Sequence, residues 1–466
     1  MSLSAIRTFR DPAGSVSIDG DVVVRTVYPT YAEATRNFLS SPVAQNLESS
    51  GRLIRTSILE GQEPQAGPLL LNHPRVFFPS YPWEWTPAQW CAAAELTLDI
   101  CEAALEEGWI LKDATPLNIL FDGPSPTFVD VLSFERREPS SPIWYAYAQF
   151  VRTFLLPLLA RRHLGWPLAA TLLRRDGYEP FSLYRRMPWW LRFHPRILWP
   201  VTLPVLLDRM GNAFERSATA RNMTYSPAVT RHVLQGTFRR LRRQVRKAAQ
   251  PLPASHWALY TTTSEHYSEQ DRERKHAFVM RVFERFRPYS VLDIGANTGE
   301  YSILAAQCGA RQIVASDTDE AAVEQLWLRA HGLNFPILPV VVDFARPTPP
   351  CGWENGENLS FLERAEGRFD LVLLLGILHH LQLSDQIPLE RIAALSARLT
   401  IKWVVAEWIP ASDLRFRALL RGREALYSWL NEDVFQTVFN DWFRTIDRQV
   451  LPNGRVLYLF EKAQQC

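Results

Sequence analysis

The sequence predicts two domains of different class: an α+β domain in the N-terminal half, and an α/β domain with a mostly parallel sheet at the C-terminus. At 466 residues the chain is longer than one hydrophobic core usually serves. Short apolar runs alternate with helical segments in the C-terminal part, whereas the N-terminal part has hairpins and proline-interrupted helices. We therefore expect domains at 1–235 and 266–466, joined by a basic helical linker at 236–265.

The composition is that of a globular chain. Apolar residues make up 47 % and charged residues 21 %, which excludes a mostly disordered protein. The net charge of +2 gives no overall field for nucleic acid. The five cysteines form no CxxC pair and no zinc spacing with histidine, so we expect no metal site and a reducing compartment. The N-terminus lacks the apolar core of a signal peptide, which predicts a cytoplasmic protein.

Two apolar runs raise the question of a membrane. Both YAYAQFVRTFLLPLLA, at 145–160, and WPVTLPVLL, at 199–207, are shorter than the roughly 20 residues of a spanning helix. We interpret them as core helices and expect no transmembrane segment. An interfacial membrane helix is the alternative.

The N-terminal half contains several recognisable elements. SVSIDGDVVVRTV, at 15–27, alternates around an Asp-Gly turn and predicts a β-hairpin. Residues 87–108 have proline in the first turn, apolar residues at helical spacing and a terminal glycine, which predicts a helix. A second hairpin is expected around Gly123 and Pro124, and helices from about 142 to 235.

The basic segment that follows is amphipathic. Leu234, Phe238, Leu241 and Val245 share one face of a helix whose other face is rich in arginine and lysine. We interpret it as a connector that packs its apolar stripe on a domain. Binding to nucleic acid or lipid is the alternative.

The C-terminal part has the pattern of a parallel sheet covered by helices. Apolar runs at 289–295, 311–317, 335–343, 369–376 and 401–408 are separated by helical or polar segments. Residues 443–462 read as two strands joined by Pro-Asn-Gly, which predicts an antiparallel hairpin at the end of the sheet.

Polar residues follow the predicted parallel strands. Asp293 ends the first, and Gly295 and Gly299 in the turn GANTGE, which also holds Asn297, let the backbone approach a ligand closely. A helix then begins near Glu300, and its free N–H groups point to a nucleotide-like ligand.

The next three strands end in further candidates. Asp317 ends the second strand, where an acid accepts hydrogen bonds from both ribose hydroxyls; Asp319 is the alternative, or a helix N-cap. Asp343 ends the third strand, within reach of an adenine amino group. His379 and His380 follow the fourth and are candidates for a base or for shaping the acceptor pocket, with inert packing as the alternative.

Together these residues resemble the class I S-adenosylmethionine-dependent methyltransferases, over roughly Tyr267 to Lys462. A dehydrogenase would have the tighter G-x-G-x-x-G, which GANTGE does not supply. The resemblance implies that S-adenosylmethionine is the cofactor. Its methionine part would lie at Asp293 and the two glycines, its ribose at Asp317 and its adenine at Asp343. Asn297 would also contribute to cofactor binding. The acceptor would be a small molecule, glycan or macromolecule.

The N-terminal half carries a second candidate site. Asp113, Asn118 and Asp130 have a spacing similar to the catalytic segment of protein kinase-like phosphotransferases, which implies a kinase-like fold. The chain departs from that family because it has no glycine-rich loop, and Arg25 stands where the phosphate-binding lysine would be. We expect a kinase-like domain that helps to recognise the acceptor. The alternative function is an ATP- and magnesium-dependent phosphotransferase fused to a methyltransferase module.

Segments from both halves resemble one bacterial family of two-part methyltransferases, some of them labelled as nodulation-associated. They include FRDPAG at 9–14, LKDATPLN at 111–118 and FDLVLLLGILHHL at 369–381. The resemblance runs along the whole chain and implies the two-domain organisation described above.

Overall fold

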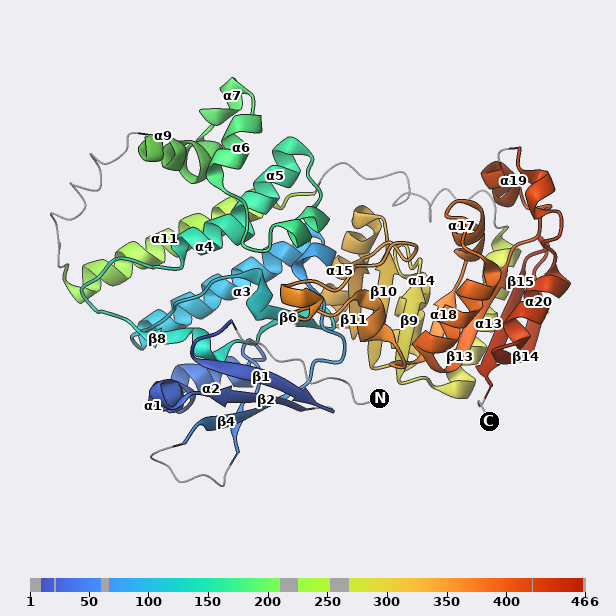
Figure 1. The fold of residues 1–466 in the computed structure, drawn as a ribbon, viewed down its shortest axis with the longest axis horizontal. Coiled ribbons are helices and arrows are strands. Elements are labelled where there is room, and N and C mark those ends of the chain that lie inside the picture. Colours follow the sequence, from blue (N-terminus) through green and yellow to red (C-terminus); the bar gives the residue numbers. More distant parts are fainter. Residues whose placement is uncertain are drawn as a thin grey trace. The chain divides into compact units, whose positions relative to one another are not determined.

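The computed structural model describes residues 10–20, 22–59, 67–209, 225–251, 268–420 and 422–463 (Figure 1). The chain forms two compact units. Unit 1 comprises Met1–Val76, Ser80–Phe121 and Pro126–Leu252, and unit 2 comprises Phe77–Pro79, Asp122–Ser125 and Pro253–Cys466. Each has its own sheets and its own core. Within the described residues, no helix is long and apolar enough to cross a membrane.

Unit 1 contains a four-stranded antiparallel sheet in the order β1-β2-β4-β3. The strands are β1 (Gly14–Asp19), β2 (Val22–Val27), β3 (Ser57–Ile58) and β4 (Leu69–Pro74). Gly14 pairs with Val27 and Asp19 with Val22, so the first predicted hairpin is confirmed. Two helices, α1 (Pro29–Leu39) and α2 (Pro42–Ser49), follow β2.

The central helix of unit 1 is α3 (Pro87–Glu106), which confirms the helix predicted at 87–108. The Thr86 side chain accepts a hydrogen bond from the Gln89 backbone, and the Gln89 side chain accepts one from Thr86, which caps the first turn. After the last turn, Gly108 adopts a positive φ of 76° and lets the chain reverse.

Two small antiparallel sheets follow α3. One pairs β5 (Trp109–Leu111) with β8 (Phe134–Arg136), and the other pairs β6 (Ile119–Asp122) with β7 (Ser125–Phe128). The second sheet confirms the hairpin expected around Gly123. Short 3₁₀ turns, η2 (Pro116–Asn118) and η3 (Val131–Ser133), stand beside these strands. Unit 1 therefore has the α+β composition that the sequence predicts.

The rest of unit 1 is helical, as expected. Prolines occupy the first turns of several helices, where their missing N–H has no partner to lose. The elements are α4 (Tyr147–Phe150), η4 (Val151–Leu155), α5 (Leu156–Leu164), η5 (Leu168–Leu173), α6 (Pro180–Arg186), α7 (Trp189–Arg192), α8 (Pro195–Ile197), η6 (Leu198–Thr202) and α9 (Leu203–Arg209).

The basic segment forms α11 (Pro227–Ala248), which packs on α3 inside unit 1. Its apolar stripe is buried, as the connector interpretation predicts. Arg242 bonds Asp99 and Glu102 of α3 at 2.6 and 3.0 Å. The expected linker is therefore shortened. Residues 236–248 belong to a helix of unit 1, and the expected boundary at 235 falls within it.

Unit 2 is built on a seven-stranded sheet in the order β11-β10-β9-β12-β13-β15-β14. The first five neighbours pair in parallel, and β15 and β14 are antiparallel. This confirms the parallel sheet and its terminal hairpin. The strands are β9 (Ser290–Ile294), β10 (Gln312–Asp317), β11 (Ile337–Val341), β12 (Phe369–Leu374), β13 (Thr400–Trp408), β14 (Phe443–Val450) and β15 (Val456–Lys462).

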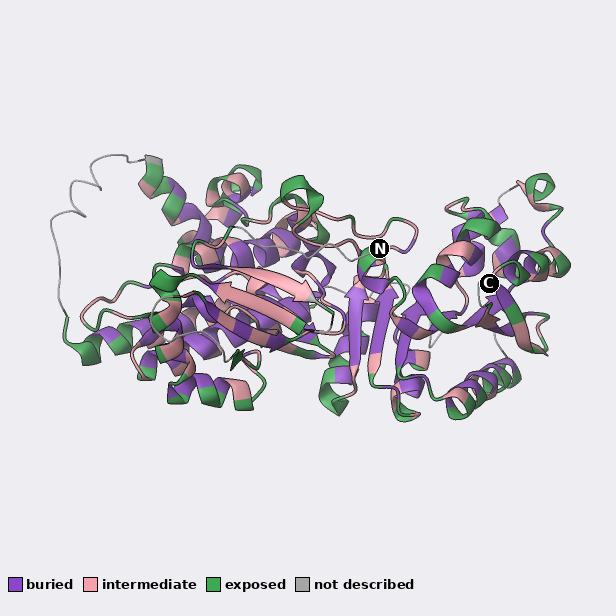
Figure 2. Cartoon of the chain, turned by 60° about the horizontal axis from the view of Figure 1, so that its bottom comes forward, coloured by how far each residue is buried: buried purple, intermediate pink, exposed green. Residues whose placement is uncertain are grey.

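Helices cover both faces of this sheet. Crossovers between parallel strands are right-handed, so the helices change face where the strand order reverses its direction. Figure 2 shows the central strands as largely buried. Phe278, Ile303 and Leu326, from three different helices, share one core with the sheet. The helices are α13 (Glu269–Phe286), α14 (Glu300–Gln307), α15 (Glu320–Leu333), α16 (Phe361–Ala365), α17 (Leu378–Leu383), α18 (Leu389–Leu399), α19 (Leu414–Leu420) and α20 (Glu432–Asn440).

Candidate functional site

A cavity of about 720 Å³ opens at the carboxyl ends of β9, β10, β11 and β12. This is the edge at which open α/β sheets bind their ligands. The sequence-predicted residues of unit 2 that line it are Asp293, Gly295, Asn297, Asp317, Asp343, His379 and His380. Gly299 is not among the lining residues; it begins the helix behind them.

The turn after β9 is tied to the neighbouring strand. The backbone N–H groups of Gly295 and Ala296 both donate to the carbonyl of Ser316, at 2.8 and 3.1 Å. Gly295, Asn297 and Gly299 all have positive φ, of 74°, 50° and 78°. A Cβ on Gly299 would lie 2.2 Å from Cδ1 of Leu326. Both the backbone conformation and the packing therefore require glycine at that position.

Asp293 is buried at the end of β9 and accepts a hydrogen bond of 2.6 Å from the Ser302 hydroxyl. Burial raises the pKa of this carboxyl to about 6, and the charge of Asp317 adds to the effect. Asp293 thus connects the strand to α14 beneath the turn.

Asp317 orders the turn from the tip of β10. Its Oδ2 accepts from the backbone N–H of Asn297 at 2.8 Å, and its Oδ1 accepts from that of Asp319 at 2.9 Å. Burial raises its pKa. Asp319 instead caps α15, because its Oδ1 accepts from the N–H groups of Ala321 and Ala322 at 2.9 and 3.0 Å. Of the two acids, Asp317 lines the cavity and Asp319 serves as the helix cap.

Asp343, just beyond β11, has contacts to both of its carboxylate oxygens. One oxygen accepts from the Ala345 backbone at 2.9 Å, and the other lies 2.9 Å from the Arg346 guanidinium, which also contacts Asp385 at 2.9 Å. Asp343 and Arg346 both line the cavity, so the carboxylate has an arginine beside it there.

The two histidines lie on α17. His379 is buried, and its Nδ1 has no hydrogen-bond partner among the described residues. Burial lowers its pKa to about 3, and His380 and Arg455 add to the effect. Burial also lowers the pKa of His380. At neutral pH both imidazoles are uncharged. His379 is then a weak base, suited to a hydrogen bond more than to proton abstraction.

A buried ion-pair network that the sequence did not predict forms another wall. Lys275 of α13 and Arg455 line the cavity, and both approach Glu407 of β13, at 2.8 and 3.6 Å. Arg455 also bonds Asp413 at 2.9 Å. Burial by itself would lower the pKa of Lys275, but the Glu407 carboxylate raises it, so Lys275 stays protonated. The sequence signal for this network is Glu407, a charged residue that follows the apolar residues WVVA in a predicted buried strand.

The site can hold a nucleoside with a free diol and position a second reactant. An acid at the second strand, a glycine turn at the first and neutral imidazoles at the fourth converge on one cavity. Within the described ranges there is no group of three or more His, Cys, Asp or Glu side chains arranged for a metal ion. The donor set fits an organic cofactor.

The N-terminal candidates also come together, inside unit 1. Asp130 forms an ion pair of 2.7 Å with Arg25, accepts from the Leu132 backbone at 3.3 Å, and accepts from the Ser133 hydroxyl. The Asn118 amide donates to Ser133 at 3.2 Å.

Asp113 belongs to the same neighbourhood and accepts a 3.4 Å hydrogen bond from Gln149. Its pKa is raised by burial and by the charge of Asp130. Because Asp130 is already bonded to the chain, it is not arranged as an open metal ligand.

Comparison with known proteins agrees with the reading of unit 2. Residues 267–402 match the model of a family described as "Methyltransferase domain". Along nearly the whole chain, the protein is similar to "Nodulation protein NoeA" of Rhizobium meliloti (strain 1021). The identity is 29 % over 472 residues, which cover 98 % of this chain and 96 % of that protein.

Two solved structures are also similar. One is N-methyltransferase NodS from Bradyrhizobium japonicum WM9 in complex with S-adenosyl-L-homocysteine, at 12 % identity and a TM-score of 0.32, covering 44 % of this chain and 99 % of that one. The other is the bifunctional kinase-methyltransferase WbdD, at 18 % identity and a TM-score of 0.31, covering 45 % of this chain and 44 % of that one. Residues 267–402 of unit 2 thus match a methyltransferase domain, and the protein is an S-adenosylmethionine-dependent methyltransferase.

Proposed function

We propose that S-adenosylmethionine binds with its ribose hydroxyls on Asp317, its adenine beside Asp343 and its methionine part over Asp293 and the turn at Gly295. The observation that carries this assignment is the position of Asp317. Its carboxylate lines the cavity at the tip of β10 and is aligned by two backbone N–H groups. A carboxylate fixed in this way is preorganised for a diol.

The acceptor, a small molecule, glycan or macromolecule, reaches the methyl group beside α17. His379 contributes a neutral imidazole with an unused ring nitrogen at the cavity wall. We assign it to orienting the acceptor, because a pKa of about 3 makes it a weak base. Alignment supplies much of the rate of a methyl transfer, since the sulfonium is already a good leaving group.

Unit 1 serves as a kinase-like scaffold for acceptor recognition. The ion pair between Arg25 and Asp130 supports this assignment over phosphoryl transfer, because the arginine occupies the carboxylate that a magnesium ion would need. We therefore do not assign ATP or magnesium to this unit.

A thermal-shift panel on the full chain tests the proposal. S-Adenosylmethionine and S-adenosylhomocysteine at about 100 times their dissociation constants should stabilise the protein by about 2.7 kcal/mol. ATP with magnesium should give no shift. Stabilisation by magnesium ATP that depends on Asp130 would overturn the assignment of unit 1. No response to either sulfur compound would overturn that of unit 2.

A further inference from the structure

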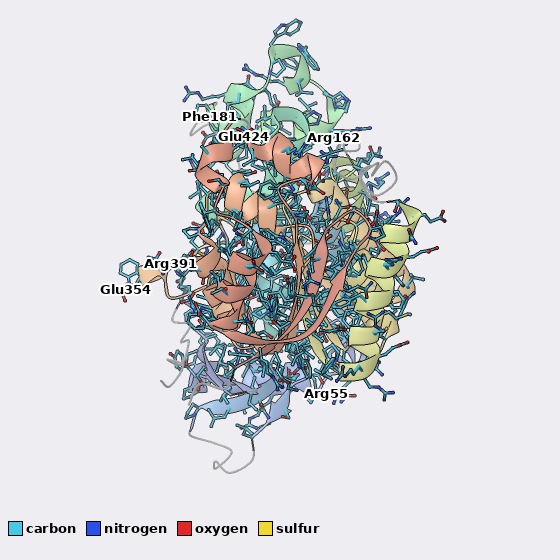
Figure 3. All side chains as sticks on the ribbon, turned by 90° about the vertical axis from the view of Figure 1, so that its right-hand side faces the viewer. Arg55, Arg162, Phe181, Glu354, Arg391 and Glu424 are labelled. Atoms are coloured by element: carbon cyan, nitrogen blue, oxygen red, sulfur yellow. The ribbon has the colours of Figure 1, made fainter. Side chains whose placement is uncertain are left out.

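Unit 1 exposes a group of large aromatic side chains on α6, α7, η6 and the turn between α7 and α8. Trp189, Trp190, Phe193 and Trp199 are 73, 62, 63 and 55 % exposed, and Phe181 is also exposed. Figure 1 shows α7 beyond α6 and α5 within this unit, and Figure 3 labels Phe181 in the same region. These residues are here called the aromatic surface. Single exposed aromatics are ordinary, but such a cluster indicates a binding surface.

The elements that carry the aromatic surface also have buried apolar side chains. Leu183, Met187, Leu191 and Ile197, on the same short elements, are buried. Arg192 donates from Nε to the carbonyl of Met187 at 3.0 Å. Buried side chains therefore anchor these short elements, while the rings remain exposed to solvent. The exposure of the rings follows from the fold of these helices.

The segment that carries the rings has an excess of arginines over acids. Between residues 161 and 200 the sequence has eight arginines and two acids, Asp176 and Glu179. Several arginines lie over aromatic rings: Arg185 over Phe181 at 5.7 Å, and Arg240 of α11 over Trp199 at 5.8 Å. Guanidinium groups among indole rings match the boundary of an anionic bilayer, where rings enter the headgroup layer and arginines meet lipid phosphates.

We propose that the aromatic surface binds the anionic surface of a lipid bilayer as a peripheral contact. A bilayer fits better than a nucleic acid because the rings project from short helices, whereas single strands are held in grooves lined by stacking platforms. The proposal is independent of the methyl-transfer site, since every residue in it belongs to unit 1.

The test measures binding of the full chain to vesicles of phosphatidylcholine, with and without phosphatidylglycerol, by co-sedimentation. Quenching of tryptophan fluorescence by a dibrominated phosphatidylcholine reports insertion. The double variant Trp189→Ala/Trp190→Ala should lower the partition coefficient on anionic vesicles at least about tenfold. Arg185→Gln/Arg196→Gln should lower it roughly tenfold at low salt, with a smaller effect at high salt.

Trp353→Ala is the matched control, because Trp353 is equally exposed, at 62 %, but lies beside the acids Glu354 and Glu357. It should leave the partition coefficient unchanged. A thermal-unfolding transition equal to that of the wild type shows that each variant is folded. Failure of the wild-type chain to bind anionic vesicles would overturn the proposal. So would equal binding by the double tryptophan variant, or tighter binding to a single-stranded oligonucleotide that depends on the same tryptophans.

Discussion

Replacing Asp317 by alanine tests the cofactor site most directly. In the proposed complex the Asp317 carboxylate accepts hydrogen bonds from the ribose, and charge-assisted bonds contribute about 1.5–3 kcal/mol each. The loss of one such bond corresponds to at least a tenfold rise in the dissociation constant, since 1.4 kcal/mol is a factor of ten. The variant also frees the N–H groups of Asn297 and Asp319, which loosens the turn and adds to the loss.

Asp319→Ala is the matched control for this experiment. It removes an acid two residues away that caps α15 and does not line the cavity. Loss of an N-cap costs about 0.5–2 kcal/mol of stability, so this variant should melt at a lower temperature but bind the cofactor normally. A third variant, Asp317→Asn, keeps the shape and one acceptor oxygen but removes the charge, and should bind with intermediate affinity.

The assay is isothermal titration calorimetry with S-adenosylhomocysteine, accompanied by thermal unfolding of each variant. We expect binding to weaken in the order wild type, Asp317→Asn, Asp317→Ala, with Asp319→Ala equal to wild type. Binding by Asp317→Ala within twofold of wild type would refute the ribose contact. Weakened binding in Asp319→Ala to the same degree would show that the effect comes from general loosening of the sheet edge.

Four further outcomes are expected. Asp293→Asn tests the buried carboxyl. The pKa of Asp293 in the folded protein, about 6, lies above its ordinary value of 3.8. Protonation of Asp293 therefore stabilises the folded state fully below about pH 4, and this stabilisation is lost as pH rises through 6. Urea unfolding at pH 4 and 7 should show wild type losing roughly 2–3 kcal/mol more than this variant. Gly299→Ala should lower stability by more than about 1 kcal/mol, whereas Gly309→Ala, with positive φ but open space, should cost less, as measured by denaturant midpoints. His379→Asn should reduce kcat without changing cofactor affinity. Because the pKa of His379 is about 3, the pH–rate profiles of wild type and variant, measured with an identified acceptor, should have the same shape above pH 5. Lys275→Met should lower the free energy of unfolding by about 3–5 kcal/mol, because Glu407 loses its nearest positive partner. Thermal unfolding of the double variant Lys275→Met/Glu407→Gln should show part of this stability recovered. An unaffected single variant would contradict the stabilising role of the ion-pair network.

The architecture of unit 2 and the candidate positions at its sheet edge could be predicted from local sequence patterns. The spacing of apolar residues along a strand and the glycines that adopt positive φ depend on neighbouring residues, so they can be recognised in the sequence. The acids at the ends of β9, β10 and β11 could be placed because parallel strands bring their carboxyl ends to one edge. Asp319 shows the limit of this reasoning, since only its bonds to α15 separate it from Asp317.

Contacts between residues far apart in the chain could be seen only in the folded structure. Lys275 and Glu407, and Arg25 and Asp130, meet across more than a hundred residues, which no spacing rule could pair. The assignment of residues 236–248 to unit 1 follows from charges on α3, since the amphipathic pattern does not say which surface the stripe covers. The pKa of His379 likewise depends on burial by side chains from other elements. Hydrophobic periodicity and turn residues can be recognised in the sequence, but burial and charge pairing arise only when distant segments pack together.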